Sequence, residues 1–260
     1  MGWLLHCFWR RGHTAKSSFA RPGFSTGVVV VLSMCFGALR LDAGIWPISR
    51  ESQIAALQVL KSLPWESSHF VDKILQAKRH FIPVKQDQGM STHCGFYALS
   101  HALSGFERFS PSGATLYSLA LDNGWYWDDS GSTIPKNLHD TAKHLGFLKV
   151  ESGWGFSGGT VSYMKALVRW GYALVVAVRG ISAEGLPDYK NFFKVGGHWV
   201  AVEGFVNLQG KDYVIIKDSN TYVRQPEFID KYLQGSHLWP VELFEKAWSF
   251  NSYVAIKPVP

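Results

Sequence analysis

The spacing of apolar residues changes part-way along this chain of 260 residues, at Gly171. Before Gly171, apolar residues recur three and four positions apart, which is the period of a helix that buries one face. After it come near-continuous apolar runs typical of buried strands, at 172–180, 198–206 and 212–220. A chain in which helices come first and strands follow, with few helices among them, is predicted to have an α+β fold.

The individual elements follow from the same patterns. Helices are expected at 52–62, 68–79, 94–103, 115–121, 135–145, 160–170 and 241–248, and further strands at 80–84, 147–152 and 252–258. The strands at 198–206 and 212–220 are separated by the turn Leu-Gln-Gly-Lys, so we expect them to pair as a hairpin. No internal repeat or low-complexity linker interrupts residues 45–260, which we interpret as one domain with a helical lead-in at 45–80.

Residues 1–44 have a pattern of their own. A basic stretch from Arg10 to Arg21 precedes the apolar run VVVVLSMCFGAL. With its flanks this run reaches about 16 residues, whereas a membrane-spanning helix needs about 20. The pattern fits a secretory signal peptide, or a short membrane anchor if it is not cleaved. We therefore expect an exported protein (periplasmic or secreted) or one anchored to a membrane by this segment. The alternative is a natural start further along, for instance at Met34, and a cytoplasmic protein.

The charge of the chain is concentrated near its start. Residues 1–50 hold +5 of the net charge of +6, so residues 51–260 carry only +1. The basic balance is therefore no argument for a nucleic-acid partner. The sequence contains no Cys/His cluster with metal-ligand spacing, no phosphate-binding loop and no dinucleotide fingerprint. It predicts no metal and no cofactor.

Cys94 is the only cysteine outside the first forty residues, which hold Cys7 and Cys35. It follows a polar loop and begins an apolar helical run. A helix N-terminus favours a thiolate and directs backbone N–H groups toward developing negative charge. Cys94 is therefore a candidate nucleophile, and the alternative is a buried cysteine that packs as a small apolar residue. Gln88, or alternatively Gln86, would join the Cys94 N–H in an oxyanion hole.

A catalytic cysteine also needs a base and a residue that orients this base. His198 begins one strand of the predicted hairpin and Asp218 ends the other. In an antiparallel hairpin these two ends lie side by side. His198 is the candidate base, and Asp218, or alternatively Asn220, is the candidate for orienting its imidazole.

Three segments, QGMSTHCGFYAL, GGHWVAVEGF and YVIIKDSN, together resemble the papain-like cysteine peptidases. The resemblance is to the bacteriocin-processing branch, which cleaves double-glycine leaders, and to its stand-alone relatives, and it covers residues 80–257. It implies a papain-like fold in which a helical half carries the cysteine and an antiparallel sheet half carries the histidine and the aspartate. It also implies Gln88 at the oxyanion position, Cys94 as nucleophile, His198 as base and Asp218 as orienting residue.

The leading hypothesis is therefore a cysteine peptidase that hydrolyses peptide bonds through an acyl-enzyme intermediate, with a peptide or protein as substrate. An acyltransferase, amidase or deamidase with the same triad is one alternative, because the triad serves any acyl transfer. A catalytically inactive papain-like binding module is another. A reactive thiolate at Cys94 would separate the enzymes from the binding module.

Overall fold

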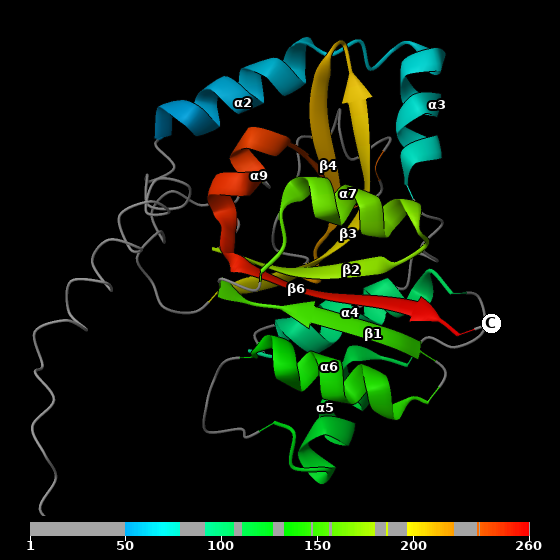
Figure 1. Cartoon of the computed structure of the whole chain (residues 1–260). Helices are drawn as coiled ribbons and strands as arrows, with labels where there is room; N and C mark the ends of the chain where they lie inside the picture. Colours follow the sequence, from blue (N-terminus) through cyan, green and yellow to red (C-terminus); the bar gives the residue numbers. More distant parts are fainter. Residues whose placement is uncertain are drawn as a thin grey trace, which may run out of the picture. The chain divides into compact units, whose positions relative to one another are not determined.

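The computed structural model describes residues 50–78, 92–106, 111–126, 133–146, 148–155, 158–179, 186, 197–220, 233 and 235–259. These residues build a six-stranded sheet in the order β1-β6-β2-β3-β4-β5 (Figure 1). The strands are β1 (Leu148–Gly153), β2 (Ala173–Val178), β3 (His198–Leu208), β4 (Lys211–Lys217), β5 (Ser236–Pro240) and β6 (Trp248–Pro258). All neighbouring strands pair antiparallel. The α+β class expected from the sequence is confirmed.

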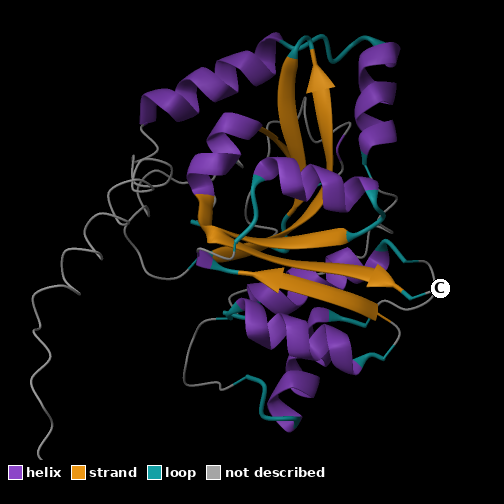
Figure 2. Ribbon diagram, viewed as in Figure 1, coloured by secondary structure: helices purple, strands orange, loops and turns teal. Residues whose placement is uncertain are grey.

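Helices cover both faces of the sheet (Figure 2). One face packs against α4 (Cys94–Ser104), α5 (Gly113–Asp122) and α6 (Pro135–His144). The other packs against α2 (Arg50–Ser62), α3 (Ser68–Ala77), α7 (Val161–Arg169) and α9 (Val241–Ala247). The alternation along β2 separates the two cores, because Leu174 and Val176 face one of them while Ala173 and Val175 face the other.

The helix α4 lies unusually deep, with ten of its eleven residues buried. The sheet face beneath it carries small side chains at Ala173, Ala177 and Ala201. On the helix, Ala98 and Ala102 are wholly buried. Small residues on both sides allow the helix and sheet to approach closely, and this packing fixes the position of the helix N-terminus.

The hairpin of β3 and β4 forms as the sequence predicts, with Leu208 paired to Lys211. The two residues between them, Gln209 and Gly210, have φ angles of 50° and 78°. Positive φ at both positions is the requirement of a type I′ turn, whose twist matches that of the strands. Further along, the pairing slips by one residue between Val202 and Gly204, which places a bulge in β3.

Several element bounds differ from the expectations. Helix α5 begins at Gly113, two residues earlier than expected, because the Ser112 hydroxyl caps it by accepting the Thr115 N–H at 3.0 Å. The last strand begins at Trp248 instead of Ser252, because Trp248 pairs with Val178 of β2. Strand β5 has no counterpart among the expected elements.

Two of the sequence expectations fall outside the described residues, namely the strand at 80–84 and the N-terminal segment 1–44. Among the helices that are described, none has the length and apolar character needed to cross a membrane.

Candidate active site

Cys94 is the first residue of α4 and is 8% exposed. The preceding residue, His93, does not cap the helix with its side chain but stacks on Tyr117, with ring centroids 3.6 Å apart. The first backbone bonds of the helix run from Phe96 N and Tyr97 N to the His93 carbonyl. The N–H groups of Cys94 and Gly95 therefore lie at the start of α4, ahead of its first intrahelical bonds. They are oriented to receive negative charge at the helix N-terminus.

His198 and Asp218 meet at one end of the sheet. His198 begins β3, and Asp218 directly follows β4, whose last residue, Lys217, pairs with Ala201. The Nε2–H group of His198 donates to Asp218 Oδ1 at 2.5 Å. The two side chains are 15% and 1% exposed, so the aspartate is shielded from water while the imidazole stays within reach of a ligand.

Cys94 lies within reach of the His198 imidazole and contributes to raising its pKa. Because Asp218 occupies Nε2 of the imidazole, Nδ1 is the nitrogen left to face the thiol. Burial lowers the pKa of His198, but the Asp218 carboxylate, its hydrogen bond and the contact with Cys94 outweigh burial and raise this pKa to about 10. His198 is therefore an imidazolium at neutral pH, and a cation beside a thiol favours the thiolate.

Besides His198, two other groups stabilise the charged form of the Asp218 carboxylate. Burial raises the pKa of Asp218, but the charge and hydrogen bond of His198, the nearby His237 and the Asn220 backbone N–H together bring it below its usual range. That N–H donates to Asp218 Oδ1 at 2.9 Å. Of the two candidate orienting residues, Asp218 is the one whose side chain contacts His198, while Asn220 contacts Asp218 through its backbone N–H.

Two buried histidines near Asp218 were not expected in the site. His237 lies on β5 opposite Ile216 of β4, diagonally from Asp218, and is 3% exposed. His101 lies on α4 two turns after Cys94, on the same helix face. Burial and the charge of Lys217 lower its pKa to about 4 against the opposing effect of Asp218, so His101 is neutral. Neither position is recognisable from sequence, since β5 shows no strand pattern and His101 sits within an apolar run.

Thr133 connects the cysteine-bearing helix to the histidine-bearing strand. Its carbonyl accepts the indole N–H of Trp199, the residue after His198, at 2.9 Å. Its side chain also covers Gly95, where an added Cβ would lie 2.6 Å from Thr133 Cγ2. A glycine at position 95 is therefore needed for the N-terminus of α4 to pack against this segment.

Gln88 and its alternative Gln86 lie outside the described residues. The oxyanion role of Gln88 stays a prediction. In the described ranges no group of three or more His, Cys, Asp or Glu side chains is arranged to hold a metal ion.

Comparison with known proteins adds little. No protein-family model and no curated protein matches the chain. Among solved structures, the crystal structure of UfSP from C. elegans is similar over 63% of this chain and 29% of that one, with 12% identity and a TM-score of 0.30. A likeness this slight carries no functional information. The resemblance to bacteriocin-processing peptidases therefore stays a prediction, and the function of this chain has to be inferred from its own residues.

Proposed function

We propose that this chain is a cysteine peptidase of papain-like fold that hydrolyses peptide bonds in a peptide or protein substrate. The observation that carries the proposal is the buried contact of 2.5 Å between His198 and Asp218, with Cys94 close enough to the same imidazole to raise its pKa. These side chains come from two different layers of the fold, the cysteine from a helix and the other two from strand ends. Their convergence is the geometry of an activated nucleophile with an oriented base.

The first half of the reaction forms an acyl-enzyme. His198 holds the proton lost by Cys94, and the thiolate sulfur attacks the carbonyl carbon of the scissile peptide bond. The Cys94 N–H, together with the Gln88 side chain, donates to the oxyanion that forms. His198 then transfers its proton to the leaving amine nitrogen as the C–N bond breaks, which leaves a thioester on Cys94.

The second half clears the thioester. His198, now neutral, removes a proton from water, and the hydroxide oxygen attacks the thioester carbon. The C–S bond breaks, the sulfur departs as a thiolate while His198 keeps the proton taken from water, and a carboxylic acid is released, which restores the starting ion pair. Throughout both halves Asp218 keeps the Nε2–H tautomer in place and stabilises the imidazolium.

The proposal is tested with a peptide-like electrophilic probe on the full chain. We expect the probe to label wild-type protein at Cys94, to leave Cys94→Ala unlabelled, and to label His198→Ala far more slowly. Peptide cleavage followed by mass spectrometry should show the same order. Turnover retained by a folded Cys94→Ala variant would refute the assignment of the nucleophile.

The same triad transfers acyl groups to acceptors other than water. Adding a primary amine during cleavage distinguishes these reactions, because an acyltransferase gives an amide product while a peptidase gives mainly the free acid. Cys94 that reacts with iodoacetamide no faster at neutral pH than an ordinary thiol of pKa about 8.5 would instead favour a binding module.

A further inference from the structure

Lys78 directly follows helix α3, and its side chain contacts the strands on both sides of β4. Its backbone N–H donates to the Ile74 carbonyl at 3.0 Å, which fixes Lys78 at the end of the helix. Its Nζ donates to the Leu233 carbonyl at 3.0 Å and to the Ser236 hydroxyl at 3.2 Å, and lies 3.5 Å from Glu203 Oε2. An ammonium group has three N–H donors, and the three oxygens around Lys78 match that number.

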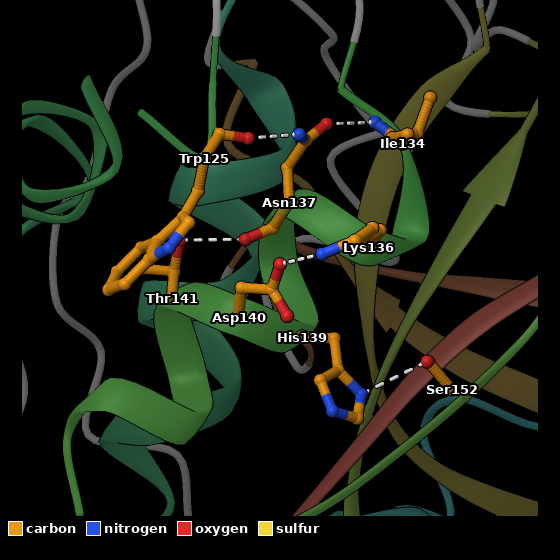
Figure 3. Close-up of polar contacts among 8 residues, drawn as sticks. All are labelled: Trp125, Ile134, Lys136, Asn137, His139, Asp140, Thr141 and Ser152. Atoms are coloured by element: carbon orange, nitrogen blue, oxygen red, sulfur yellow. Dashed lines mark hydrogen bonds and ion pairs between the residues drawn. The ribbon is translucent and has the colours of Figure 1, made fainter. Parts of the chain in front are cut away.

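The ion pair between Lys78 and Glu203 is buried, with side chains 17% and 2% exposed. The pair of Lys136 and Asp140 shows the contrast, because both residues lie on α6, one turn apart, and Lys136 is 75% exposed (Figure 3). An exposed pair of this kind contributes little to stability, whereas a buried charge that loses its partner is costly. The Lys78 pair therefore constrains the elements that it joins, which are α3 and β3.

The partners of Lys78 lie on the two strands that flank the end of β4. Glu203 belongs to the bulge of β3. Ser236 is the first residue of β5 and pairs with Lys217, the last residue of β4. Asp218 follows directly. Because β4 lies between β3 and β5 in the sheet, Lys78 links both neighbours of the strand end that carries Asp218.

The register of β5 determines the surroundings of Asp218. Among the described strands, β5 is five residues long, lies at an edge of the sheet and pairs with β4 alone. It places His237 opposite Ile216, from where His237 contributes to lowering the pKa of Asp218. A slip of one residue would turn every side chain of β5 to the other face of the sheet. The bond from Lys78 to Ser236 opposes such a slip at the residue next to His237.

We propose that Lys78 is a positioning residue for the triad. By joining the β3 bulge to the start of β5, it holds the end of β4 in the place from which Asp218 accepts the Nε2–H of His198. Catalytic side chains have to be held to within about 0.5 Å of their working geometry, and the contact of 2.5 Å between these two depends on both strand ends. The inference rests on the proposed peptidase function and adds to it a residue that acts through the sheet rather than on the substrate.

The test uses a double variant of the full chain, Lys78→Met with Glu203→Gln. It removes the link but leaves no unpaired charge in the core, which avoids the large destabilisation of Lys78→Met alone. The matched control is Lys165→Met with Asp212→Asn. This ion pair, with 2.5 Å between Nζ and Oδ2, also joins a helix, α7, to β4, but at the opposite end of the strand from Asp218. Circular dichroism and urea denaturation verify that both double variants are folded.

The first measurement follows the Nε2 proton of His198 by NMR. Its bond to Asp218 is short and charge-assisted, so the proton should resonate at low field, and its absence in His198→Gln assigns the signal. We expect the control double variant to keep the wild-type signal. The Lys78 double variant should shift this signal upfield or lose it, because a displaced Asp218 no longer protects the proton from exchange with water.

The second measurement is the rate of Cys94 alkylation by iodoacetamide at pH 6. The Lys78 double variant should react about tenfold more slowly than wild-type protein, which is the effect of raising the thiol pKa by one unit. The control double variant should react at the wild-type rate. In peptide cleavage, the Lys78 double variant should lower kcat and leave KM unchanged, because the change affects the triad and not the surface that binds the peptide.

The outcomes separate a positioning role from a merely structural one. A Lys78 double variant that loses stability but keeps the NMR signal and the alkylation rate would overturn the inference. Equal changes in the control double variant would also overturn it, since they would reflect a general loosening of the sheet. Failure of the proposed function is seen separately: wild-type protein that shows the His198 signal and a reactive thiolate but cleaves no peptide would refute the peptidase, while the NMR signal of the Lys78 double variant still decides its positioning role.

Discussion

Replacing Asp218 with asparagine preserves the shape of the side chain but removes the charge that faces His198. The rise in the His198 pKa from 6.5 to about 10 corresponds to about 5 kcal/mol in favour of the imidazolium, at about 1.4 kcal/mol for each pKa unit. Burial acts in the opposite direction and lowers the pKa of the imidazole, whether or not Asp218 is charged. In Asp218→Asn we therefore expect burial to dominate and the pKa of His198 to fall below 6.5.

The assay is the rate of Cys94 alkylation by iodoacetamide between pH 5 and 10. Mass spectrometry of the Cys94 peptide separates this reaction from alkylation of Cys7 and Cys35. Wild-type protein should react rapidly at pH 6, because the imidazolium is present and favours the thiolate. Asp218→Asn should follow the profile of an ordinary thiol with a pKa near 8.5, and react roughly 100-fold more slowly at pH 6.

Asn220→Ala is the control for this experiment. The Asn220 backbone N–H that donates to Asp218 is retained in the alanine variant, so the alkylation profile should stay close to that of wild-type protein. An Asp218→Asn variant that keeps the wild-type profile would refute the reasoning. A loss confined to Asn220→Ala would instead assign the orienting role to Asn220.

Three further outcomes are expected. The folded-state pKa of His198, about 10, exceeds the unfolded value of 6.5, so the stabilising contribution of this residue is complete below pH 6.5 and declines up to about pH 10. In thermal denaturation, the difference in Tm between wild-type protein and His198→Gln should therefore shrink from pH 6.5 to pH 10. Gly95→Ala should displace Thr133 and slow Cys94 alkylation, with circular dichroism to verify that the fold is intact. Lys78→Met leaves the buried Glu203 without its ion-pair partner, and the free energy of unfolding measured by urea denaturation should fall by about 3–5 kcal/mol. The double variant Lys78→Met with Glu203→Gln should recover much of this stability, because it no longer buries an unpaired charge.

The sequence predicts the β3–β4 hairpin, and with it the contact between His198 and Asp218. Two apolar runs around a short turn specify antiparallel pairing, and pairing brings the start of β3 next to the end of β4. The contact between His198 and Asp218 follows from this register, without any knowledge of the rest of the fold. The burial of α4 is also predictable, because its sequence is apolar around most of its circumference.

Other parts of the site depend on packing that no local pattern specifies. Strand β5 is five residues long and ends at Pro240, so it lacks the alternation by which strands are recognised. Its pairing with β4 is nevertheless what brings His237 close to Asp218. Ile134 and Trp154 likewise line one hollow from the N-terminus of α6 and from the residue after β1, two element ends that no local sequence pattern places side by side.

The lead-in helices α2 and α3 show why the folded unit begins well before Cys94. An added Cβ at Gly204, in the β3 bulge, would lie 2.0 Å from the Ala77 carbonyl oxygen, so α3 ends in direct contact with the strand that begins at His198. Lys78 then donates to the Leu233 carbonyl at 3.0 Å and to the Ser236 hydroxyl at 3.2 Å, which joins α3 to β5 as well.

The lead-in helices also contact the rest of the domain through buried apolar side chains. Leu60, Trp65, Phe70 and Ile74 of the lead-in are each at most 7% exposed and belong to the core opposite α4. At about 1.5–3 kcal/mol for each large side chain, their burial contributes an amount comparable with the net stability of a whole domain, about 5–15 kcal/mol. We therefore expect removal of residues 50–78 to destabilise the protein by an amount comparable with its net stability.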